Sequence, residues 1–527
     1  MTVHVSATPQ IIPADAPFSE EQRAWLNGFF ADVLFNQLAL PETLPSAAPK
    51  EDETTPWKDP ALLIEERMGL AEKRPLRWRM MAAMAQQDCG QCGSSCRDYS
   101  GAIAEQAEGR LNLCVPRGKA TSRMLKALVE EMGGGVIDPE AMAANAAATA
   151  PVETDQRPGR SRSHPVKARF LRRARLNGEG SEKTTCHIDI DLAGTGLTYE
   201  VGDSLGIFPR NDPALADAVL AAIDVPPDFP IAGEPLRDVL IERTSLGAAP
   251  DALFQFISYL TGGERRKKAQ ALAKGDDPDG DLVHLDVLGA LQKFAGIRPD
   301  PEALMEVLEP LQPRLYSISS SPKTDAERVS LTVDLVRYEA AARQRLGVAS
   351  TFLGERVDGS DEVLVYVQKA HGFALPANSE TPIIMVGPGT GVAPFRAFLH
   401  ERMATEAKGP AWLFFGHQRE ACDFFYADEL EMLRQRGTLT NLSLAWSRDG
   451  TQKIYVQDRM RERGEELHAW LKSGAHFYIC GDAKRMAKDV ETTLIDIVAE
   501  HGGVGRDDAT GFINSLKAEG RYQADVY

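Results

Sequence analysis

The chain has 527 residues, of which 43% are hydrophobic and 26% charged, and its formal net charge is −17. This length favours several domains, and the composition is that of a folded protein rather than a disordered one. The acidic balance argues against nucleic acid as a partner, no apolar run is long enough to span a bilayer, and the N-terminus lacks the features of a secretory signal. We therefore expect a cytoplasmic protein with no membrane partner.

Four of the seven cysteines cluster near the N-terminus. Residues 1–75 are expected to be a helical segment, and residues 76–132 a small module with the cysteine spacing C-x2-C-x3-C-x17-C. Thiolates bind soft metals, and three on one loop with a fourth after a helix, expected over 100–108, can surround an iron–sulfur cube. We expect a 4Fe-4S cluster, with a zinc site or metal-free reactive thiols as alternatives. The expected ligands are Cys89, Cys92, Cys96 and Cys114.

Composition and periodicity change twice along the rest of the chain. Residues 133–163 are rich in Gly, Ala and Pro and are expected to form a flexible linker. Alternating apolar residues over 164–380 predict an antiparallel β-barrel, interrupted by a helical, Pro-punctuated insertion over 212–311. Over 381–527, short apolar runs alternate with helical stretches, which is typical of a parallel α/β sheet. The sequence thus predicts a multidomain fold.

Two strings in the predicted barrel suit a flavin. The string Arg314-Leu315-Tyr316-Ser317 offers a cation for a pyrophosphate, a flat aromatic for the ring and a small hydroxyl. The string Gly347-Val348-Ala349-Ser350 precedes a predicted helix, whose first backbone amides can bind phosphate. Either string alone is weak, because an isolated Arg-x-Tyr-Ser is more often a strand with an exposed arginine.

The order and spacing of these strings, with Tyr199–Pro209 (YEVGDSLGIFP), resemble the ferredoxin-reductase-like flavoproteins of the diflavin-reductase branch. Within that branch, 164–527 is most similar to the flavoprotein components of NADPH-dependent assimilatory sulfite reductases. Members of that branch carry an FMN domain upstream of the FAD domain. Residues 1–160 contain no recognisable phosphate loop of such a domain, so we expect FAD and no FMN. The cysteine segment resembles the iron–sulfur module of ferredoxin:NAD oxidoreductase subunits and corrinoid proteins. The resemblance implies that FAD is held by Arg314, Tyr316, Ser317, Thr332, Val333, Asp334, Tyr338, Gly347, Val348, Ala349, Ser350 and Tyr527, the last lying on the flavin face.

A nicotinamide site is expected in the α/β part. A glycine-rich turn over 387–391 joins a predicted strand to a predicted helix, where backbone can approach a pyrophosphate. A hydroxyl, two cations and an aromatic follow a later predicted strand: Ser447, Arg448, Lys453 and Tyr455. These groups suit a 2′-phosphate with adenine beside it. The resemblance implies that Ser317, Cys480 and Asp525 serve hydride transfer. It implies that NADPH is held by Thr390, Ser447, Arg448, Lys453, Ile454, Tyr455, Val456, Gln457 and Asp489.

These observations predict an NADPH-dependent oxidoreductase that passes electrons from NADPH to FAD, then to the cluster, then to a partner haemoprotein. The resemblance implies that the partner is the haem and iron–sulfur subunit of sulfite reductase, in the assimilation of sulfur from sulfite to sulfide. The alternative is a nitrite or nitrate reductase as acceptor, with the cysteine module a zinc-bound docking domain. The sequence leaves the acceptor, the oligomeric state and the choice between cluster and zinc open.

Overall fold

The computed structural model describes residues 56–58, 62–87, 92, 94–114, 116, 118–131, 157–341, 343–359, 361–370, 372–483 and 485–527. All of them except Pro56 belong to one compact unit, Trp57–Tyr527. Most of the predicted helical segment 1–75, the expected ligand Cys89 and most of the predicted linker 133–163 lie outside the described residues. Within the described part of the chain, no helix is long and apolar enough to cross a bilayer.

Four α-helices form a small unit around the cysteine segment. Arg79 and Glu131 tie two of them together through two hydrogen bonds of 2.7 and 3.1 Å. The helix that was predicted over 100–108 begins at Cys96 and ends at Ala104, because the Ser95 hydroxyl accepts the N–H of the third residue onward and so caps an earlier first turn. The helices are α2 (Ile64–Ala71), α3 (Leu76–Ala83), α4 (Cys96–Ala104) and α5 (Gly118–Glu131), preceded by the 3-10 turn η1 (Pro56–Lys58).

The next part is a six-stranded antiparallel sheet in the order β6-β3-β10-β1-β2-β7. The alternation in β2 sets its faces: Cys186, Ile188 and Ile190 enter the core, while His187 and Asp189 bond each other at 2.9 Å on the other face. A single antiparallel bridge joins Ile318, after β6, to Leu331 of β7, and the closed barrel stays a prediction. The strands are β1 (Val166–Arg175), β2 (Thr185–Asp191), β3 (Ser204–Ile207), β6 (Arg314–Ser317), β7 (Arg328–Asp334) and β10 (Glu362–Gln368).

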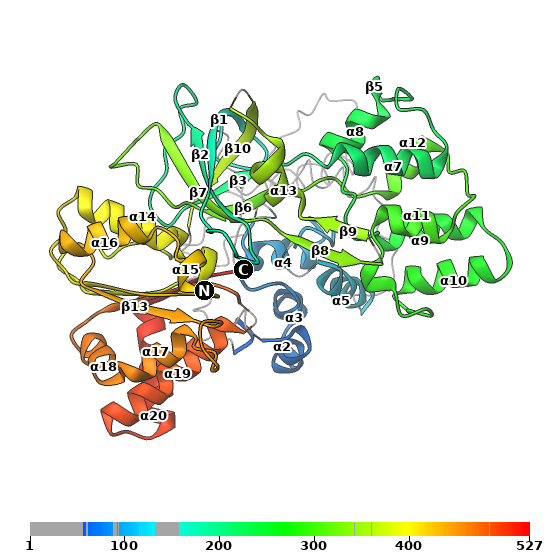
Figure 1. Cartoon of the computed structure of the whole chain (residues 1–527). Coiled ribbons are helices and arrows are strands. Elements are labelled where there is room, and N and C mark those ends of the chain that lie inside the picture. Colours follow the sequence, from blue (N-terminus) through cyan, green and yellow to red (C-terminus); the bar gives the residue numbers. More distant parts are fainter. Residues whose placement is uncertain are drawn as a thin grey trace, which may run out of the picture. The chain divides into compact units, whose positions relative to one another are not determined.

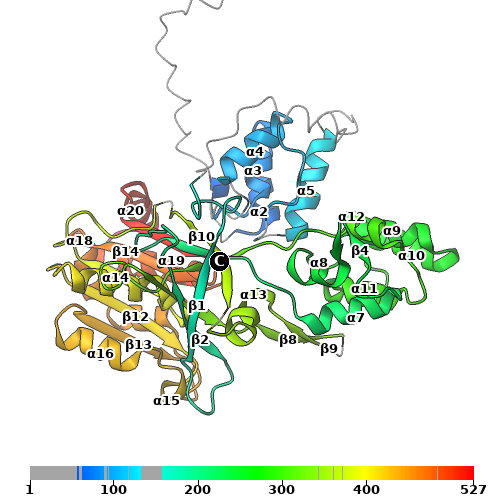
Figure 2. The same cartoon turned by 90° about the horizontal axis from the view of Figure 1, so that it is seen from above.

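A helical body separates β3 from β6 in the sequence (Figure 2). It has an apolar core of its own, which includes Leu253, Phe254 and Leu291. Asp212 and Asp300 cap two of its helices, each followed by a proline at the first helical position. Its elements are α7 (Pro213–Ile223), β4 (Pro230–Ile231), β5 (Glu234–Pro235), α8 (Leu236–Glu242), α9 (Asp251–Leu260), α10 (Gly263–Lys274), η3 (Leu282–His284), α11 (Val287–Lys293) and α12 (Pro301–Val307).

A hairpin and a short helix follow β7 and lead into β10. The hairpin pairs β8 with β9 in antiparallel register, and the helix continues directly into a π-helical turn. These elements are β8 (Arg337–Ala340), β9 (Arg343–Leu346), α13 (Val348–Thr351) and the π-turn η4 (Phe352–Arg356).

The C-terminal part is a five-stranded parallel sheet in the order β13-β12-β11-β14-β15; the apolar runs predicted a parallel sheet and its first four strands, but not β15. Strand β11 is buried on both faces: Ile383 and Met385 share an apolar cluster with residues of α14 and α16, and Ile384 and Val386 share another with residues of α17–α20. Figure 1 shows α14 and α16 on one side of the sheet and α17–α20 on the other. The strands are β11 (Ile383–Val386), β12 (Ala411–His417), β13 (Asn441–Trp446), β14 (His476–Gly481) and β15 (Tyr522–Val526). The helices are η5 (Gly389–Val392), α14 (Ala393–Ala404), α15 (Glu420–Asp423), α16 (Ala427–Gln435), α17 (Val456–Glu462), α18 (Gly464–Lys472), α19 (Met486–Gly502) and α20 (Arg506–Ala518).

Candidate functional site

A cavity of about 850 Å³ lies where the antiparallel sheet meets the parallel sheet. Its volume is within the range of cofactor pockets, and its walls combine aromatic, hydroxyl and charged groups. Many of the residues predicted from the sequence line it together. They are Arg314, Tyr316, Ser317, Thr332, Asp334, Gly347, Val348, Ala349, Ser350, Thr390, Asp525 and Tyr527.

Strand β6 forms one wall of the cavity. Its pairing with β3 sets Tyr316 opposite Leu205 and Ser317 opposite Ser204, so alternate side chains of β6 take different faces. Burial raises the pKa of Tyr316 and lowers that of Arg314. The guanidinium of Arg314 stays charged at any ordinary pH, so this wall offers a phenol beside a fixed cation.

Three predicted side chains converge at the inner end of the cavity. The hydroxyl of Ser317 donates to Oδ2 of Asp525 at 2.5 Å, and the thiol of Cys480 reaches the same oxygen at 3.7 Å. Strands β14 and β15 pair Cys480 directly with Asp525, which explains their closeness. Burial raises the pKa of Asp525, and the two hydrogen bonds oppose this effect only in part. The carboxyl can therefore hold a proton to a higher pH than an exposed aspartate, next to a hydroxyl and a thiol.

The start of α13 forms another wall. A side chain at Gly347 would lie 2.7 Å from both Ser350 Oγ and Val336 Cβ, so only glycine fits here. The Ser350 hydroxyl accepts the N–H of Val336 at 3.1 Å and donates to the Gly347 carbonyl at 3.2 Å. One side of this turn therefore packs closely against Val336, and the other side faces the cavity.

Two predicted flavin residues are placed differently. Val333 is buried in the core of the antiparallel sheet, because Thr332 and Asp334 on either side of it take the cavity face. Tyr338, on β8, lines a second cavity of about 370 Å³, which touches the first at Val348. Side-chain contact with a flavin in the larger cavity is therefore geometrically open to Thr332 and Asp334 but not to Val333.

Tyr527 closes the cavity from the parallel-sheet side. Its hydroxyl lies 2.8 Å from the hydroxyl of Thr390 in the glycine-rich turn. That turn packs tightly on β14: a side chain at Gly391 would lie 2.2 Å from the carbonyl oxygen of Cys480. The ring of Tyr527 and the turn predicted to approach a nucleotide therefore share one edge of the cavity.

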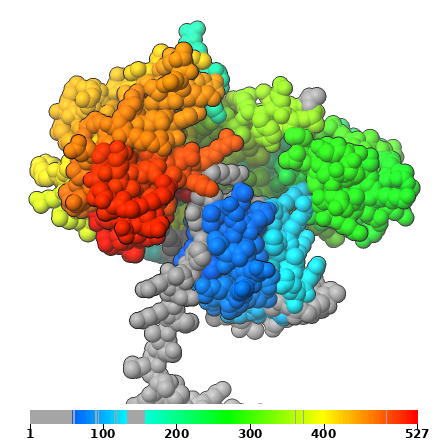
Figure 3. All heavy atoms as spheres, turned by 90° about the horizontal axis from the view of Figure 1, so that it is seen from below, coloured from blue at the N-terminus to red at the C-terminus, as the bar shows by residue number. Residues whose placement is uncertain are grey.

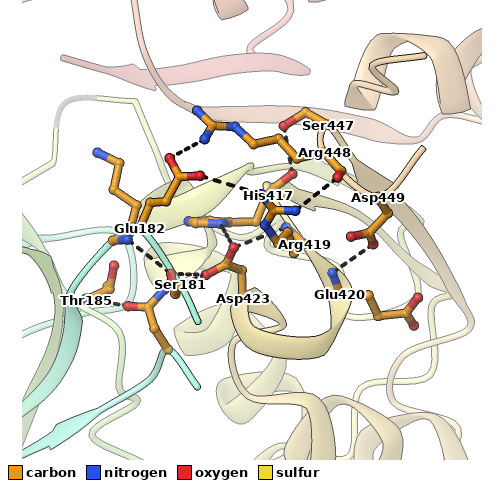
Figure 4. A network of polar contacts seen from close by, with 12 residues as sticks. Ser181, Glu182, Thr185, His417, Arg419, Glu420, Asp423, Ser447, Arg448 and Asp449 are labelled. Carbon is orange, nitrogen blue, oxygen red and sulfur yellow. Dashed lines mark hydrogen bonds and ion pairs between the residues drawn. The ribbon is translucent and has the colours of Figure 1, made fainter. Parts of the chain in front are cut away.

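The predicted 2′-phosphate residues lie outside this cavity, at the carboxyl end of β13 (Figure 4). Ser447 donates to the carbonyl of His417 at 3.2 Å, and Arg448 forms an ion pair with Glu182. Arg419 contributes a second guanidinium, 3.5 Å from the Glu182 carboxylate and 3.3 Å from the carbonyl of Arg448. The sequence did not identify Glu182 or Arg419, since neither belongs to a local motif.

The remaining predicted nucleotide residues surround the start of α17. Lys453 is exposed, and Ile454 leads to Tyr455, a residue that is 45% exposed and whose backbone N–H donates to Asp458 at 2.9 Å. Val456 belongs to the apolar core under the sheet, so its side chain cannot reach solvent-borne nucleotide. Gln457 is half-buried in the first turn of α17, and Asp489 is exposed in the first turn of α19.

The cysteine module reaches the same cavity as the flavin strings, since Gln86, Gln87 and Pro116 line it. Cys114 is two residues from Pro116, and its Sγ accepts the N–H of Ala85 at 3.4 Å. Hydrogen bonds of this kind to cysteine sulfur are among the features that tune iron–sulfur centres. Cys96 and Cys114 share one apolar cluster, but within the described residues no three ligating side chains converge on a common metal position, and Cys89 lies outside them.

The module also contacts the helical insertion. Arg123 of α5 bonds Asp251 of α9 through two nitrogens at 3.2 and 3.0 Å, and Asn112 donates to Glu309 at 3.2 Å. The space-filling view shows the module, in blue and cyan, beside the green insertion (Figure 3). These contacts hold the segments around Gln86 and Pro116 at the cavity.

Family models match two parts of the chain. The model described as FAD binding domain matches residues 158–274 and 246–352, and the model described as oxidoreductase NAD-binding domain matches residues 385–492. These two parts contain the antiparallel sheet except β10, its helical insertion and most of the parallel sheet.

The chain is also similar to proteins named sulfite reductase (NADPH) flavoprotein alpha-component. It is 38% identical to that of Bacillus subtilis (strain 168) over 431 residues, which are 81% of this chain and 70% of the relative. It is 42% identical to that of Escherichia coli O157:H7 over 378 residues, which are 70% of this chain and 61% of the relative. The chain thus spans 61% of the length of the Escherichia coli relative.

Proposed function

Because this chain belongs to the family of the flavoprotein alpha-components of NADPH sulfite reductase, we propose that it oxidises NADPH through a bound FAD and delivers the electrons to the haem and iron–sulfur subunit of a sulfite reductase. The observation that carries the proposal is the single cavity in which Arg314, Tyr316 and Ser317 meet Asp525 and Tyr527. FAD supplies the ability to take two electrons from NADPH and to release them one at a time.

The cavity residues fit FAD by their chemistry. We propose that Tyr316 and Tyr527 flank the flat ring, and that Arg314 and the turn Gly347–Ser350 bind the pyrophosphate. Val333 and Tyr338 complete the proposed set, the first through its backbone and the second at the neighbouring cavity. The close packing behind Gly347, where a Cβ would collide with Ser350, holds this turn in place beside the cavity.

The nicotinamide end is assigned to the inner group of side chains. Thr390 and the glycine-rich turn orient the nucleotide, and the Ser317 hydroxyl and the Cys480 thiol hold the Asp525 carboxyl at the reacting end. A fixed polar group at this position stabilises charge that develops during electron transfer between the two rings. At the far end, the proposed 2′-phosphate and adenine contacts come from Ser447, Arg448, Lys453, Ile454, Tyr455, Gln457 and Asp489, and from the backbone of Val456, whose side chain is buried.

We propose a 4Fe-4S cluster as the exit for electrons, with Cys89, Cys92, Cys96 and Cys114 as ligands. The donor set is four thiolates, which is the usual set for such a cluster. The N–H of Ala85 aimed at Cys114 supports it, as do Gln86 and Pro116 at the cavity, because these neighbours of a proposed ligand lie beside the proposed flavin.

We extend this assignment to the parts of the chain. Residues 76–132 form the cluster module, 133–163 its linker, 164–380 an FAD domain whose sheet closes into a barrel, and 381–527 the NADPH domain. The second candidate is a zinc-bound docking module, and the contacts between Arg123 and Asp251 are compatible with it as well as with a cluster module.

The test uses the purified full chain. We expect about one FAD, no FMN, and four iron and four sulfide per chain, with NADPH-dependent reduction of ferricyanide. Added to a sulfite reductase haem subunit, it should produce sulfide from sulfite at the expense of NADPH. Zinc without iron in the purified protein would refute the cluster and support the zinc-bound docking module. Electron transfer to a nitrite reductase but not to the sulfite reductase haem subunit would identify the nitrite reductase as the acceptor.

A further inference from the structure

Glu182 lies on the loop between β1 and β2, in the part of the chain that matches the FAD-binding model, yet its side chain reaches across to the parallel sheet (Figure 4). One carboxylate oxygen pairs with Nη1 of Arg448, and the other lies 3.5 Å from Nη2 of Arg419. The hydrogen bond from Arg448 lowers the pKa of Glu182, so this carboxylate is charged at neutral pH. The Glu182 carboxylate, from the part with the antiparallel sheet, therefore pairs with two arginines of the part with the parallel sheet.

The loop that carries Glu182 is fixed by a buried anchor. Asp423, fully buried at the end of α15, accepts the amide of Asn177 at 2.8 Å and the hydroxyl of Ser181 at 2.5 Å. The N–H of Gly178 donates to the carbonyl of Cys422 at 2.7 Å. Because Ser181 immediately precedes Glu182, the backbone of Glu182 stays beside the two arginines even when its side chain turns away.

We propose that Glu182 is a specificity-determining residue that competes with the 2′-phosphate of NADPH for Arg448 and Arg419. The inference rests on the proposed function, which assigns Arg448 to that phosphate. A carboxylate and a phosphate both accept hydrogen bonds from a guanidinium, but a phosphate carries up to two charges and more oxygens. The phosphate therefore displaces Glu182, whereas the ribose hydroxyl of NADH has no charge with which to do so.

The competition has a consequence for release of NADP⁺. As the 2′-phosphate leaves, the Glu182 carboxylate can pair with the Arg448 guanidinium again. The cation then exchanges one anion for another instead of being left without one. Both partners are about half exposed, so the ion pair is modest. Removing it should tighten the binding of 2′-phosphorylated nucleotides by about two- to fivefold and leave NADH unaffected.

The test compares Glu182→Gln with Glu179→Gln in the full chain. Glu179 is an exposed carboxylate on the same loop and forms no ion pair with any residue that the structure describes, so it controls for the loss of one negative charge. The probe is 2′,5′-ADP, whose dissociation constant is measured by calorimetry without turnover. Glu182→Gln should bind it about two- to fivefold more tightly than the wild type, and Glu179→Gln should match the wild type.

A second comparison links the effect to Arg448. In an Arg448→Ala background, Glu182→Gln should change the affinity for 2′,5′-ADP much less than in the wild type, because the cation that pairs most closely with Glu182 is gone and only the longer contact with Arg419 remains. Unchanged or weaker binding by Glu182→Gln would overturn the inference, and so would an equal gain in Glu179→Gln. Failure of the wild type to bind 2′,5′-ADP at all would instead refute the proposed NADPH site.

Discussion

The hydroxyl of Ser317 donates a hydrogen bond of 2.5 Å to the carboxylate of Asp525, although 208 residues separate them in the chain. Ser317 belongs to the antiparallel sheet and Asp525 to the parallel sheet, so this hydrogen bond joins the two sheets directly. Burial raises the pKa of Asp525, and the bond to Ser317 limits that rise.

Asp525→Asn should slow the reduction of the flavin by NADPH by about a hundredfold, because the inner end of the cavity loses an ionisable group that stabilises charge and can hold a proton. FAD content and the Michaelis constant for NADPH should change little, since neither proposed phosphate site is touched. Stopped-flow absorbance of the flavin measures this rate. A variant that is reduced as fast as the wild type would place the chemistry elsewhere.

Arg448→Ala should raise the Michaelis constant for NADPH by roughly ten- to a hundredfold and leave that for NADH nearly unchanged, because only NADPH carries the 2′-phosphate. The readout is steady-state reduction of ferricyanide with each nucleotide. Arg434→Ala is the matched control, since Arg434 is an exposed arginine of the same sheet domain that pairs with Glu431 at 3.1 Å on α16. Equal losses with both nucleotides would contradict the assignment.

Tyr527→Ala should tighten nicotinamide binding and reduce the preference for NADPH over NADH, because the proposed flavin face cannot hold the tyrosine ring and the nicotinamide together. The ratio of the kcat/KM values for the two nucleotides measures the effect. Tyr527→Phe serves as control, since it removes the 2.8 Å contact with the Thr390 hydroxyl but keeps the ring. If Tyr527→Ala leaves the ratio unchanged, the ring does not cover the nicotinamide position.

Cys92→Ser should lose iron, the broad iron–sulfur absorption and electron delivery to the haem subunit. It should keep FAD and the NADPH-dependent reduction of ferricyanide, which can accept electrons from the flavin directly. Cys186→Ser, a buried cysteine in the core of the antiparallel sheet, is the control and should keep its iron. Full delivery of electrons by Cys92→Ser would rule out the relay and favour a docking module.

Glu429→Gln should lower stability at pH 7 by roughly 2–4 kcal/mol and have a much smaller effect near pH 3. Burial alone would raise the pKa of Glu429, but the bonds from His400 at 2.9 Å and Arg396 at 2.7 Å outweigh it and lower this pKa to about 2. A depressed carboxyl pKa stabilises the folded state above the unfolded pKa, and the gain is lost as pH falls from about 4.5 towards 2.

Thermal unfolding at the two pH values measures this difference. Glu431→Gln removes an exposed carboxylate of the same helix, α16, and should change stability by less than about 1 kcal/mol at either pH. The same loss for Glu429→Gln at pH 3 and pH 7 would show that packing, not ionisation, explains its effect.

Local patterns predicted much of this architecture. The uniformly apolar Ile383–Val386 became a central parallel strand because both its faces are covered, and the alternation in 185–191 became a strand with one core face. The same alternation explains why Val333 enters the core between two cavity residues. A motif of consecutive residues does not by itself show which residues point to the core and which to the cavity. The motif alone could therefore not separate Val333 from its neighbours Thr332 and Asp334.

Contacts between distant segments could not be predicted in this way. Glu182 and Arg448 are 266 residues apart, and nothing near either residue marks the other as its partner. The start of α4 at Cys96 was missed by one turn, because a cysteine at a first helical position gives no signal of its own and the cap is made by Ser95.

The pairing of β3 with β6 affects how the chain reaches its folded state. Ser204 pairs with Ser317, so the whole helical insertion must lie between two neighbouring strands. Closing so long a loop is slow when it is flexible, but the insertion has its own core and can collapse first, which shortens the distance to be closed. Strand β3 must wait with an open edge until then. We therefore expect the wall that bears Arg314, Tyr316 and Ser317 to form late in folding, so that cofactor capture would follow the collapse of a segment that supplies none of that wall.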